Sequence, residues 1–234
     1  MSGGRRREVL DAAVGVLATG GLRRLTYQAV DTTAGVPPGT TSNHFRNRNA
    51  LLDGIVAHLE ALDREDWERG VGTLPAAHAG TVPDDPSVPS GPDELAAALD
   101  RLVRHLVGPG RHRTTARYAL TLEAIARPAV GEALRRGHAS LLDWGARILG
   151  AMGSPDPQEH SRTLAALLDG LMFQQVSLPE DGFDPLPSIR TAVRAMLPET
   201  AGGTATESGA GAGSGAGAGS DAGTGRAGAA PARA

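Results

Sequence analysis

The sequence predicts an all-α protein, with an amino-terminal three-helix helix-turn-helix domain followed by a helical bundle. Apolar residues recur at helical spacing in one segment after another, and no segment alternates with a period of two over a convincing length. Residues 1–49 carry seven Arg against three acidic residues, net +4, and the rest carries 16 Arg against 23 acidic residues, net −7. A basic head on an acidic body fits one nucleic-acid-binding end, although chance clustering gives the same asymmetry.

The first helix is predicted from apolar residues at helical spacing, namely Val9, Ala13, Val16 and Leu17. The pair Gly20-Gly21 is expected to stop it. Arg5-Arg6-Arg7 at its start fit either a solvated arm or a contact with a neighbouring groove of DNA.

Residues 26–48 predict a helix, a tight turn and a second short helix. Thr26 can cap the first of these by accepting from free backbone N–H groups. Gly35 can end it, because glycine takes the left-handed conformation at little cost. Pro38 suits the start of the next helix, where its missing N–H is not needed. Two helices joined in this way form a helix-turn-helix, whose second helix enters the major groove of DNA.

The same segment resembles the amino-terminal domain of TetR-type transcriptional repressors through Ala34-Gly35-Val36, Gly39-Thr40, His44-Phe45, Arg48 and Ala50-Leu51. The resemblance covers about residues 5–62 and is architectural beyond them. It implies an all-helical homodimer that binds a palindromic operator in double-stranded DNA. It also implies that a small-molecule effector, of unknown identity, occupies a second domain and causes release.

A major-groove helix needs short side chains for close approach, and donors and acceptors for base edges. Both are supplied by Gly39, Thr40, Thr41, Ser42 and Asn43. Asn43 suits bidentate readout of adenine, and Thr41 suits contact with a thymine methyl.

By resemblance, Thr26, Thr40 and His44 would contact phosphates, and Arg48 would add a charge at the start of the next helix. Thr26 is a helix cap in either case, and His44 could instead pack beside Phe45, which we assign to the core with Val30 and Val36.

Three positions depart from the commonest family pattern. Asp31 stands where a small apolar residue is usual, Thr41 replaces a Leu, and Ser42 replaces a Tyr that grips the DNA backbone. Because a buried unpaired carboxylate costs several kcal/mol, Asp31 is expected to be solvated or paired with Arg23 or Arg24. Because Thr41 and Ser42 are smaller than the usual Leu and Tyr, we predict that packing of large side chains anchors the recognition helix less than in the family.

Residues 50–67 predict a longer helix with an apolar stripe of Leu52, Ile55, Val56, Leu59 and Leu62. Helical patterns resume at Asp93, and later ones cover residues 129–151, 160–178 and 189–197. The helix between them is expected to bury Tyr118, Leu122 and Ile125 and to end before Pro128. The domains are therefore predicted as 1–49 for DNA binding and 50–198 for regulation and dimerisation. A mobile loop is expected at 70–92, and a disordered Gly/Ala/Ser-rich tail at 199–234.

Ligand pockets are mostly apolar with a few placed polar groups. The residues predicted to line one are Arg117, Tyr118, Leu122, Trp144 and Met172, with His138 or Gln174 as further polar candidates. Ordinary core packing explains each of them as well. For dimerisation, a small-residue face is predicted on the 160–178 helix at Thr163, Ala166, Gly170 and Phe173, and packing within the chain is the alternative.

No catalytic motif, metal-ligand spacing or cofactor loop is recognisable, so we expect no enzyme activity, no metal and no cofactor. No apolar run approaches the roughly 18 residues that span a bilayer, and the chain has no cysteine, which is compatible with a reducing cytoplasm. The alternative function is a helical interaction protein that has lost sequence-specific DNA binding. Its support is the three departures from the family pattern.

Overall fold

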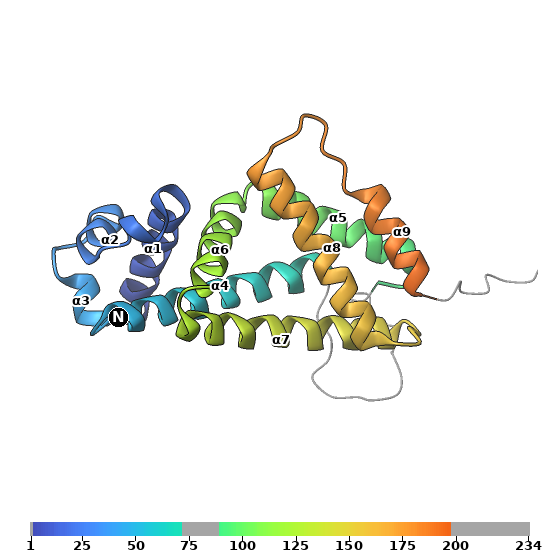
Figure 1. Cartoon of the computed structure of the whole chain (residues 1–234), viewed down its shortest axis with the longest axis horizontal. Coiled ribbons are helices and arrows are strands. Elements are labelled where there is room, and N and C mark those ends of the chain that lie inside the picture. The colour runs from blue at the N-terminus through green and yellow to red at the C-terminus, as the bar shows by residue number, and fades with distance from the viewer. Residues whose placement is uncertain (1, 72–88, 198–234) are drawn as a thin grey trace, which may run out of the picture. The chain divides into compact units, whose positions relative to one another are not determined.

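In the computed structural model, which describes residues 2–71 and 89–197, the regular secondary structure is entirely helical, and the all-α prediction is confirmed (Figure 1). The first four helices are α1 (Ser2–Arg24), α2 (Tyr27–Ala34), α3 (Thr40–His44) and α4 (Arg48–Val71). They are followed by α5 (Pro92–Val107), α6 (Arg111–Ala124), α7 (Pro128–Ala151), α8 (Pro157–Ser177) and α9 (Leu186–Met196). Residues 72–88 of the loop predicted at 70–92, and the whole tail predicted at 199–234, lie outside the described residues. At the two ends of the predicted loop, α4 continues to Val71 and α5 begins at Pro92.

Helix α1 is interrupted at the glycine pair, where the sequence predicts a stop. Its backbone leaves the helical conformation at Gly21, with φ +62°, and the helix continues to Arg24 after this kink. The positive φ explains why glycine occupies the bend, since side chains disfavour that region.

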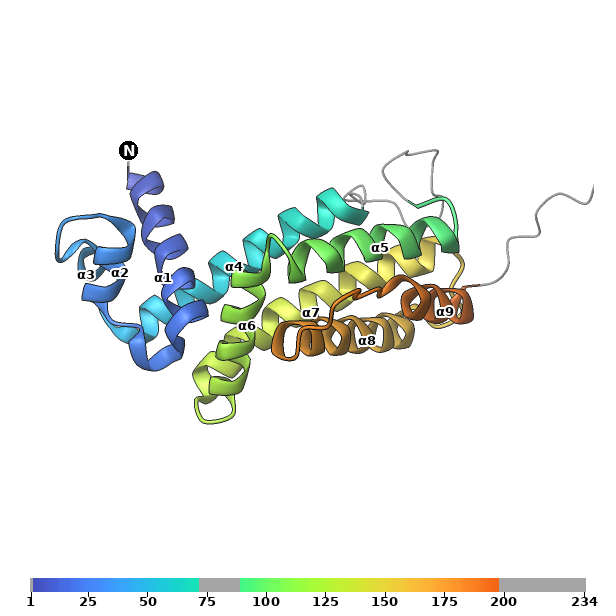
Figure 2. The same ribbon diagram turned by 90° about the horizontal axis from the view of Figure 1, so that it is seen from above.

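The first hydrophobic core joins α1 to α4 with parts of α6 and α7. Val9, Leu17 and Val30 are almost completely buried in it, and so is Ile55 of the predicted stripe on α4. Helix α6 packs against α1 and contributes Leu120 to the same core. The helix-turn-helix head, residues 1–49, is therefore tied to the rest of the described chain through α6 as well as through α4 (Figure 2).

The second core lies among α5, α7, α8 and α9. Helix α7 packs along α8, and α5 packs against α9 (Figures 1 and 2). The predicted apolar positions of α9, including Ile189 and Val193, are fully buried here.

The predicted face of α6 is wrong. Leu122 is 62% exposed and Ile125, just beyond the helix, is 85% exposed. The helix buries Thr114, Ala116 and Leu120 instead, because α1 covers that side. Periodicity alone could not distinguish these two faces, since both carry apolar residues.

Within the described residues, every helix is too short or too polar to cross a membrane.

Candidate nucleic-acid interface and ligand cavity

The turn chemistry of the helix-turn-helix follows the sequence closely. The Thr26 side chain caps α2 by accepting from the N–H of Ala29 at 3.1 Å, and Gly35 ends it with φ +63°. Gly39 precedes α3 with φ +89°, a second position where glycine is required. Pro38 lies in the turn before α3 and not in its first helical residue, since α3 begins at Thr40.

Most of the predicted DNA-contacting residues lie on accessible parts of this motif. Thr26, Ser42 and Asn43 are exposed, and Thr40 and His44 are partly exposed. The hydroxyl of Thr40 donates to the carbonyl oxygen of Pro37 at 2.6 Å. Such a local bond holds a side chain in one orientation and leaves its oxygen lone pairs as acceptors.

Thr41 is an exception. It is fully buried, and its hydroxyl donates to the Oδ1 atom of Asp31 at 2.5 Å. The prediction that Thr41 reads a thymine methyl is therefore wrong.

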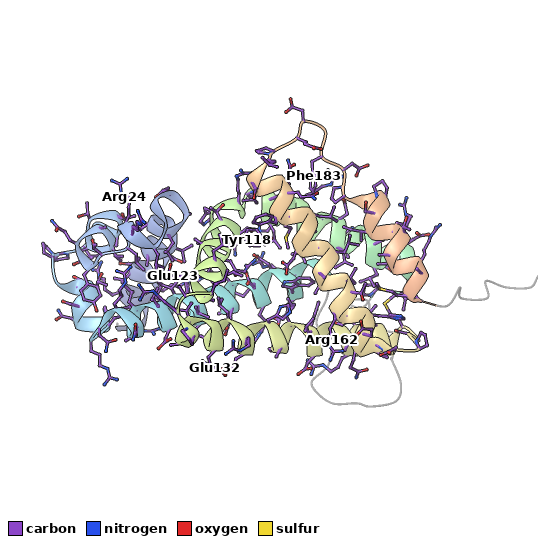
Figure 3. The ribbon with its side chains drawn as sticks, viewed as in Figure 1. Arg24, Tyr118, Glu123, Glu132, Arg162 and Phe183 are labelled. Atoms are coloured by element: carbon purple, nitrogen blue, oxygen red, sulfur yellow. The ribbon has the colours of Figure 1, made fainter. Side chains whose placement is uncertain are left out.

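The expectation for Asp31 is also wrong. Its carboxylate is neither solvated nor held by Arg23 or Arg24, both of which are exposed. Figure 3 shows Arg24 at the outer edge of the head. Asp31 accepts instead from backbone and hydroxyl groups of the turn and of α3, so the sequence reasoning looked for the wrong class of partner.

Arg48 has a different environment from the one expected. Its guanidinium donates to the carbonyl oxygens of Leu25 at 2.5 Å and Leu22 at 2.6 Å, at the end of α1. These bonds join the start of α4 to the head. Arg46, exposed between α3 and α4, is a cation that the sequence reasoning missed, and the signal was its place in the basic cluster 44–48.

An apolar cavity of about 40 Å³ lies in the body among α4, α5, α7 and α8. It is lined by Trp67, Leu95, Leu99, Leu141, Leu142, Trp144, Gly145, Ile148, Leu149, Ser161, Leu164, Ala165 and Leu168. The rings of Trp67 and Trp144 meet edge to face, with centroids 5.4 Å apart. The hydroxyl of Ser161 donates to the carbonyl oxygen of Leu142 at 2.8 Å, so its proton is already used.

The structure does not bring the predicted pocket residues together. Trp144 lines the cavity, but Leu122 is exposed and Met172 is buried in the second core. Tyr118 faces α8, where its ring packs edge to face on Phe173 at 5.2 Å (Figure 3). Arg117 forms an ion pair with Asp63 of α4.

Trp67 was missed as a cavity residue. The available signal was its position eight residues after Leu59, which continues the apolar stripe of α4.

Ion pairs between partly or fully buried side chains connect α4 to α6. Arg117 pairs with Asp63, and Arg113 pairs with Asp66 at 2.7 Å, where the Asp66 side chain is only 1% exposed. Burial raises the pKa of Asp63, and the neighbouring guanidinium groups of Arg117 and Arg113 oppose that rise only in part. In the described part of the chain, no group of three or more His, Cys, Asp or Glu could hold a metal ion.

The comparisons with known proteins agree with this architecture. Residues 90–199 match the family model described as a tetracyclin repressor-like C-terminal domain. A putative TetR-family transcriptional regulator from Rhodococcus sp. superposes with a TM-score of 0.65 and 21% identity, over 85% of this chain and 100% of that one. A TetR-family member from Streptomyces coelicolor gives a TM-score of 0.61 and 25% identity, over 83% of this chain and 98% of that one.

Residues 90–199 therefore form a tetracyclin repressor-like C-terminal domain, and the described chain has the fold of TetR-family transcriptional regulators. Another similar structure is the multidrug binding protein EbrR complexed with proflavin, with a TM-score of 0.52, 28% identity and coverage of 82% of this chain and 99% of that one. Nothing among the curated proteins matches the sequence.

The departures of Asp31 and Thr41 from the TetR-type pattern have a structural meaning. The two residues contact each other under the recognition helix, and neither faces outward. Ser42 alone of the three departures lies on the exposed surface of α3, where its hydroxyl donates to the carbonyl oxygen of Gly39 at 2.9 Å.

Proposed function

We propose that this TetR-family regulator is a ligand-responsive repressor, which binds a palindromic operator as a homodimer and releases it when a small molecule enters the body. The observation that carries the proposal is the course of α4. Its first residue, Arg48, is bonded to the end of α1, and Trp67 near its other end forms part of the cavity wall. In this proposal residues 1–49 bind DNA, residues 50–198 regulate and dimerise, and the protein is not an enzyme.

The DNA contacts divide between base reading and phosphate binding. Asn43 is exposed on α3 and carries an amide that can pair with the donor and acceptor of adenine. Thr26, Thr40 and His44 flank it as phosphate contacts. Arg46 adds an exposed charge of the kind that makes binding salt-dependent.

The dimer is proposed to form through α8. Its small-residue face, Thr163, Ala166, Gly170 and Phe173, is exposed along its whole length. The exposure of Thr163, Ala166 and Gly170 argues against the alternative of packing within the chain, whereas the ring of Phe173 also packs on Tyr118 of α6. A Cβ atom added at Gly170 would meet no other atom within 4 Å, so a partner helix has room to approach closely there. A two-fold dimer also presents two recognition helices to the two halves of a palindrome.

The effector is proposed to be a small, uncharged aromatic or apolar molecule. The described lining consists of apolar side chains together with Gly145 and one serine, whose hydroxyl proton is already bonded. EbrR is described in complex with proflavin, a ligand that also offers aromatic rings, and here Trp67 and Trp144 present theirs.

The size of the cavity suggests how the effector acts. A volume of about 40 Å³ holds only about three water molecules, so an effector must push the lining helices apart. From Arg48 to Trp67, α4 spans 19 steps of 1.5 Å, about 28 Å. Displacement of Trp67 would therefore reach the head through one continuous helix.

The alternative of an interaction protein without DNA reading has lost most of its basis. It depended on Asp31, Thr41 and Ser42, and the first two are bonded to each other beneath α3. Their replacement of the usual residues does not alter the outward surface of the recognition helix.

Selection of duplexes from a random library with the purified protein tests the proposal. We expect a palindrome with half-sites about one helical turn apart, and affinity that falls steeply between about 50 and 200 mM salt. Asn43→Ala should relax the preference at one base position by roughly 1–3 kcal/mol. A folded protein that enriches no sequence would refute the repressor proposal and favour the interaction protein.

Intrinsic fluorescence tests the effector site, because Trp67 and Trp144 are the only two tryptophans in the chain. Apolar aromatic compounds that release the selected DNA should also change this fluorescence, and Trp67→Phe should remove part of the change. Release by a compound that leaves the fluorescence of both residues unaltered would place the effector elsewhere.

A further inference from the structure

The carboxylate of Asp31 is buried beneath the recognition helix, with the residue 3% exposed. It projects from α2 and accepts three hydrogen bonds. The N–H of Gly39 donates to Oδ2 at 2.8 Å, and the N–H and hydroxyl of Thr41 donate to Oδ1 at 2.8 and 2.5 Å. Every one of these donors belongs to α3 or to the residue that caps it.

The group keeps its negative charge in this position. Burial opposes ionisation, but the hydroxyl of Thr41 and the two backbone N–H groups outweigh it, and the pKa of Asp31 falls below its ordinary value. Hydrogen bonds to an ionised acceptor are stronger and more directional than neutral ones. The contact therefore restricts both the distance of α3 from α2 and its rotation.

Helix α3 depends on such a contact because it has only five residues, Thr40–His44. A helix this short has little stability of its own. At its other end, the hydroxyl of Tyr27 donates to the carbonyl oxygen of Phe45 at 2.8 Å. Two side chains of α2 thus hold α3 from both ends, and the exposed Asn43 lies between these two attachments.

In the usual family pattern, these two positions hold a small apolar residue and a Leu. Here the two departures form a bonded pair in the same place. We propose that Asp31 and Thr41 act together as a positioning pair, which sets the orientation of the recognition helix for reading bases. The effect on DNA affinity rests on the proposed function, whereas the effect on α3 itself does not.

The test uses the full-length protein and the duplex that the wild type selects. Asp31→Asn keeps the shape but turns one acceptor into a donor facing an N–H group. We expect about a tenfold or greater loss of affinity for the selected duplex, with weak salt-dependent binding to unrelated DNA retained. Thr41→Val removes only the hydroxyl bond, so its loss should be smaller. Asp53 is an exposed carboxylate on α4, so Asp53→Asn is the matched control. It should change neither the affinity for the selected duplex nor the binding to unrelated DNA.

The decisive variant restores the usual pattern. Asp31→Ala alone should weaken specific binding, and Asp31→Ala combined with Thr41→Leu should recover it to within about threefold, since the cavity is filled again. A double variant no better than Asp31→Ala, or an Asp31→Asn protein that binds the selected duplex like the wild type, would overturn the pairing.

A DNA-free measurement separates this proposal from the proposed function. Amide hydrogen exchange of Gly39 and Thr41 should accelerate in Asp31→Asn while exchange in α5 and α9 stays unchanged. If the wild type selects no DNA, the repressor proposal fails but faster exchange at these two amides still supports the positioning pair. Unchanged exchange in both Asp31→Asn and Thr41→Val overturns it.

Discussion

Removal of the Arg117 side chain should show how much the ion pair between α4 and α6 stabilises the body. Arg117→Ala leaves the carboxylate of Asp63 beside α6 without its nearest cation. Breaking a buried pair costs about 3–5 kcal/mol, and we expect about 3 kcal/mol because 21% of the Arg117 side chain and 23% of the Asp63 side chain reach water. For a folded region of this size, that corresponds to a melting temperature lower by about 6–12 °C.

The assay is urea and thermal unfolding followed by circular dichroism. Arg162→Ala is the matched control, because Arg162 pairs with Glu159 on the surface of α8 with both side chains more than 60% exposed (Figure 3). An exposed pair of this kind contributes less than about 1 kcal/mol. In a double-mutant cycle, Asp63→Ala combined with Arg117→Ala should be more stable than Arg117→Ala alone, since no uncompensated charge remains.

The loss should also depend on pH. The folded pKa of Asp63 is raised above its unfolded value, mainly by burial, so this group favours the folded state at low pH and that contribution is lost as the pH rises through the folded pKa. Without Arg117 the folded pKa rises further, and the stability deficit of Arg117→Ala should be smaller at pH 5 than at pH 8. A deficit no larger than that of Arg162→Ala, at either pH, would refute the reasoning.

Three further predictions concern packing, acid stability and assembly. Gly54→Ala should lower the free energy of unfolding by about 1 kcal/mol, because its Cβ would lie 2.5 Å from Cε1 of the buried Phe45. Gly15→Ala, whose Cβ would meet open space, should raise it by up to about 1 kcal/mol, and urea unfolding measures both. Because the folded pKa of Asp31 is lowered, its carboxylate stabilises the folded protein above its unfolded pKa, near 3.9, and this stabilisation is lost as the pH falls through the lower folded pKa. In an acid titration the wild type should therefore unfold at a higher pH than Asp31→Ala/Thr41→Leu, which has no such carboxylate. Phe173→Asp should convert the proposed dimer to a monomer in sedimentation experiments, and an unchanged dimer would remove α8 from the interface.

The sequence was most informative where a local rule determines the structure. Thr26 and Gly35 cap α2 as their chemistry requires, and the predicted apolar stripe of α4 is buried from Leu52 to Leu59, with Leu62 only partly covered. These features depend on neighbours within a few residues, which a sequence displays directly. The exposed positions of Ser42 and Asn43 on α3 follow from the same local geometry.

The sequence was least informative where partners come from other helices. Arg48 donates to carbonyl oxygens of residues more than twenty positions away in the sequence. A sequence pattern does not show which backbone carbonyl groups are left as acceptors for a distant side chain. The partners of Asp31 were sought among cations, although backbone N–H groups satisfy a carboxylate equally well. The cavity depends on how four helices diverge, so Trp67 and Trp144 could be matched only in three dimensions.

The position of the ion pair along α4 predicts how an effector would move the helix. Asp63 lies four residues from Trp67 and fifteen from Arg48, about 6 and 22 Å along the axis. If the bonded contact with α6 acts as the pivot, a 1 Å displacement at the cavity becomes about 4 Å at the start of α4.

Because the chain has no cysteine, spin labels can be introduced cleanly at Asp53→Cys and Glu68→Cys, each paired with a reference label at Arg135→Cys on α7. On addition of an effector that releases DNA, the two α4 positions should move in opposite directions, with residue 53 moving about twice as far, since it lies ten residues from the pivot and residue 68 lies five. Movement of both in the same direction by equal amounts would mean that α4 slides as a rigid rod. In that case α6, which packs on α1 independently, would be the element that carries the signal to the head.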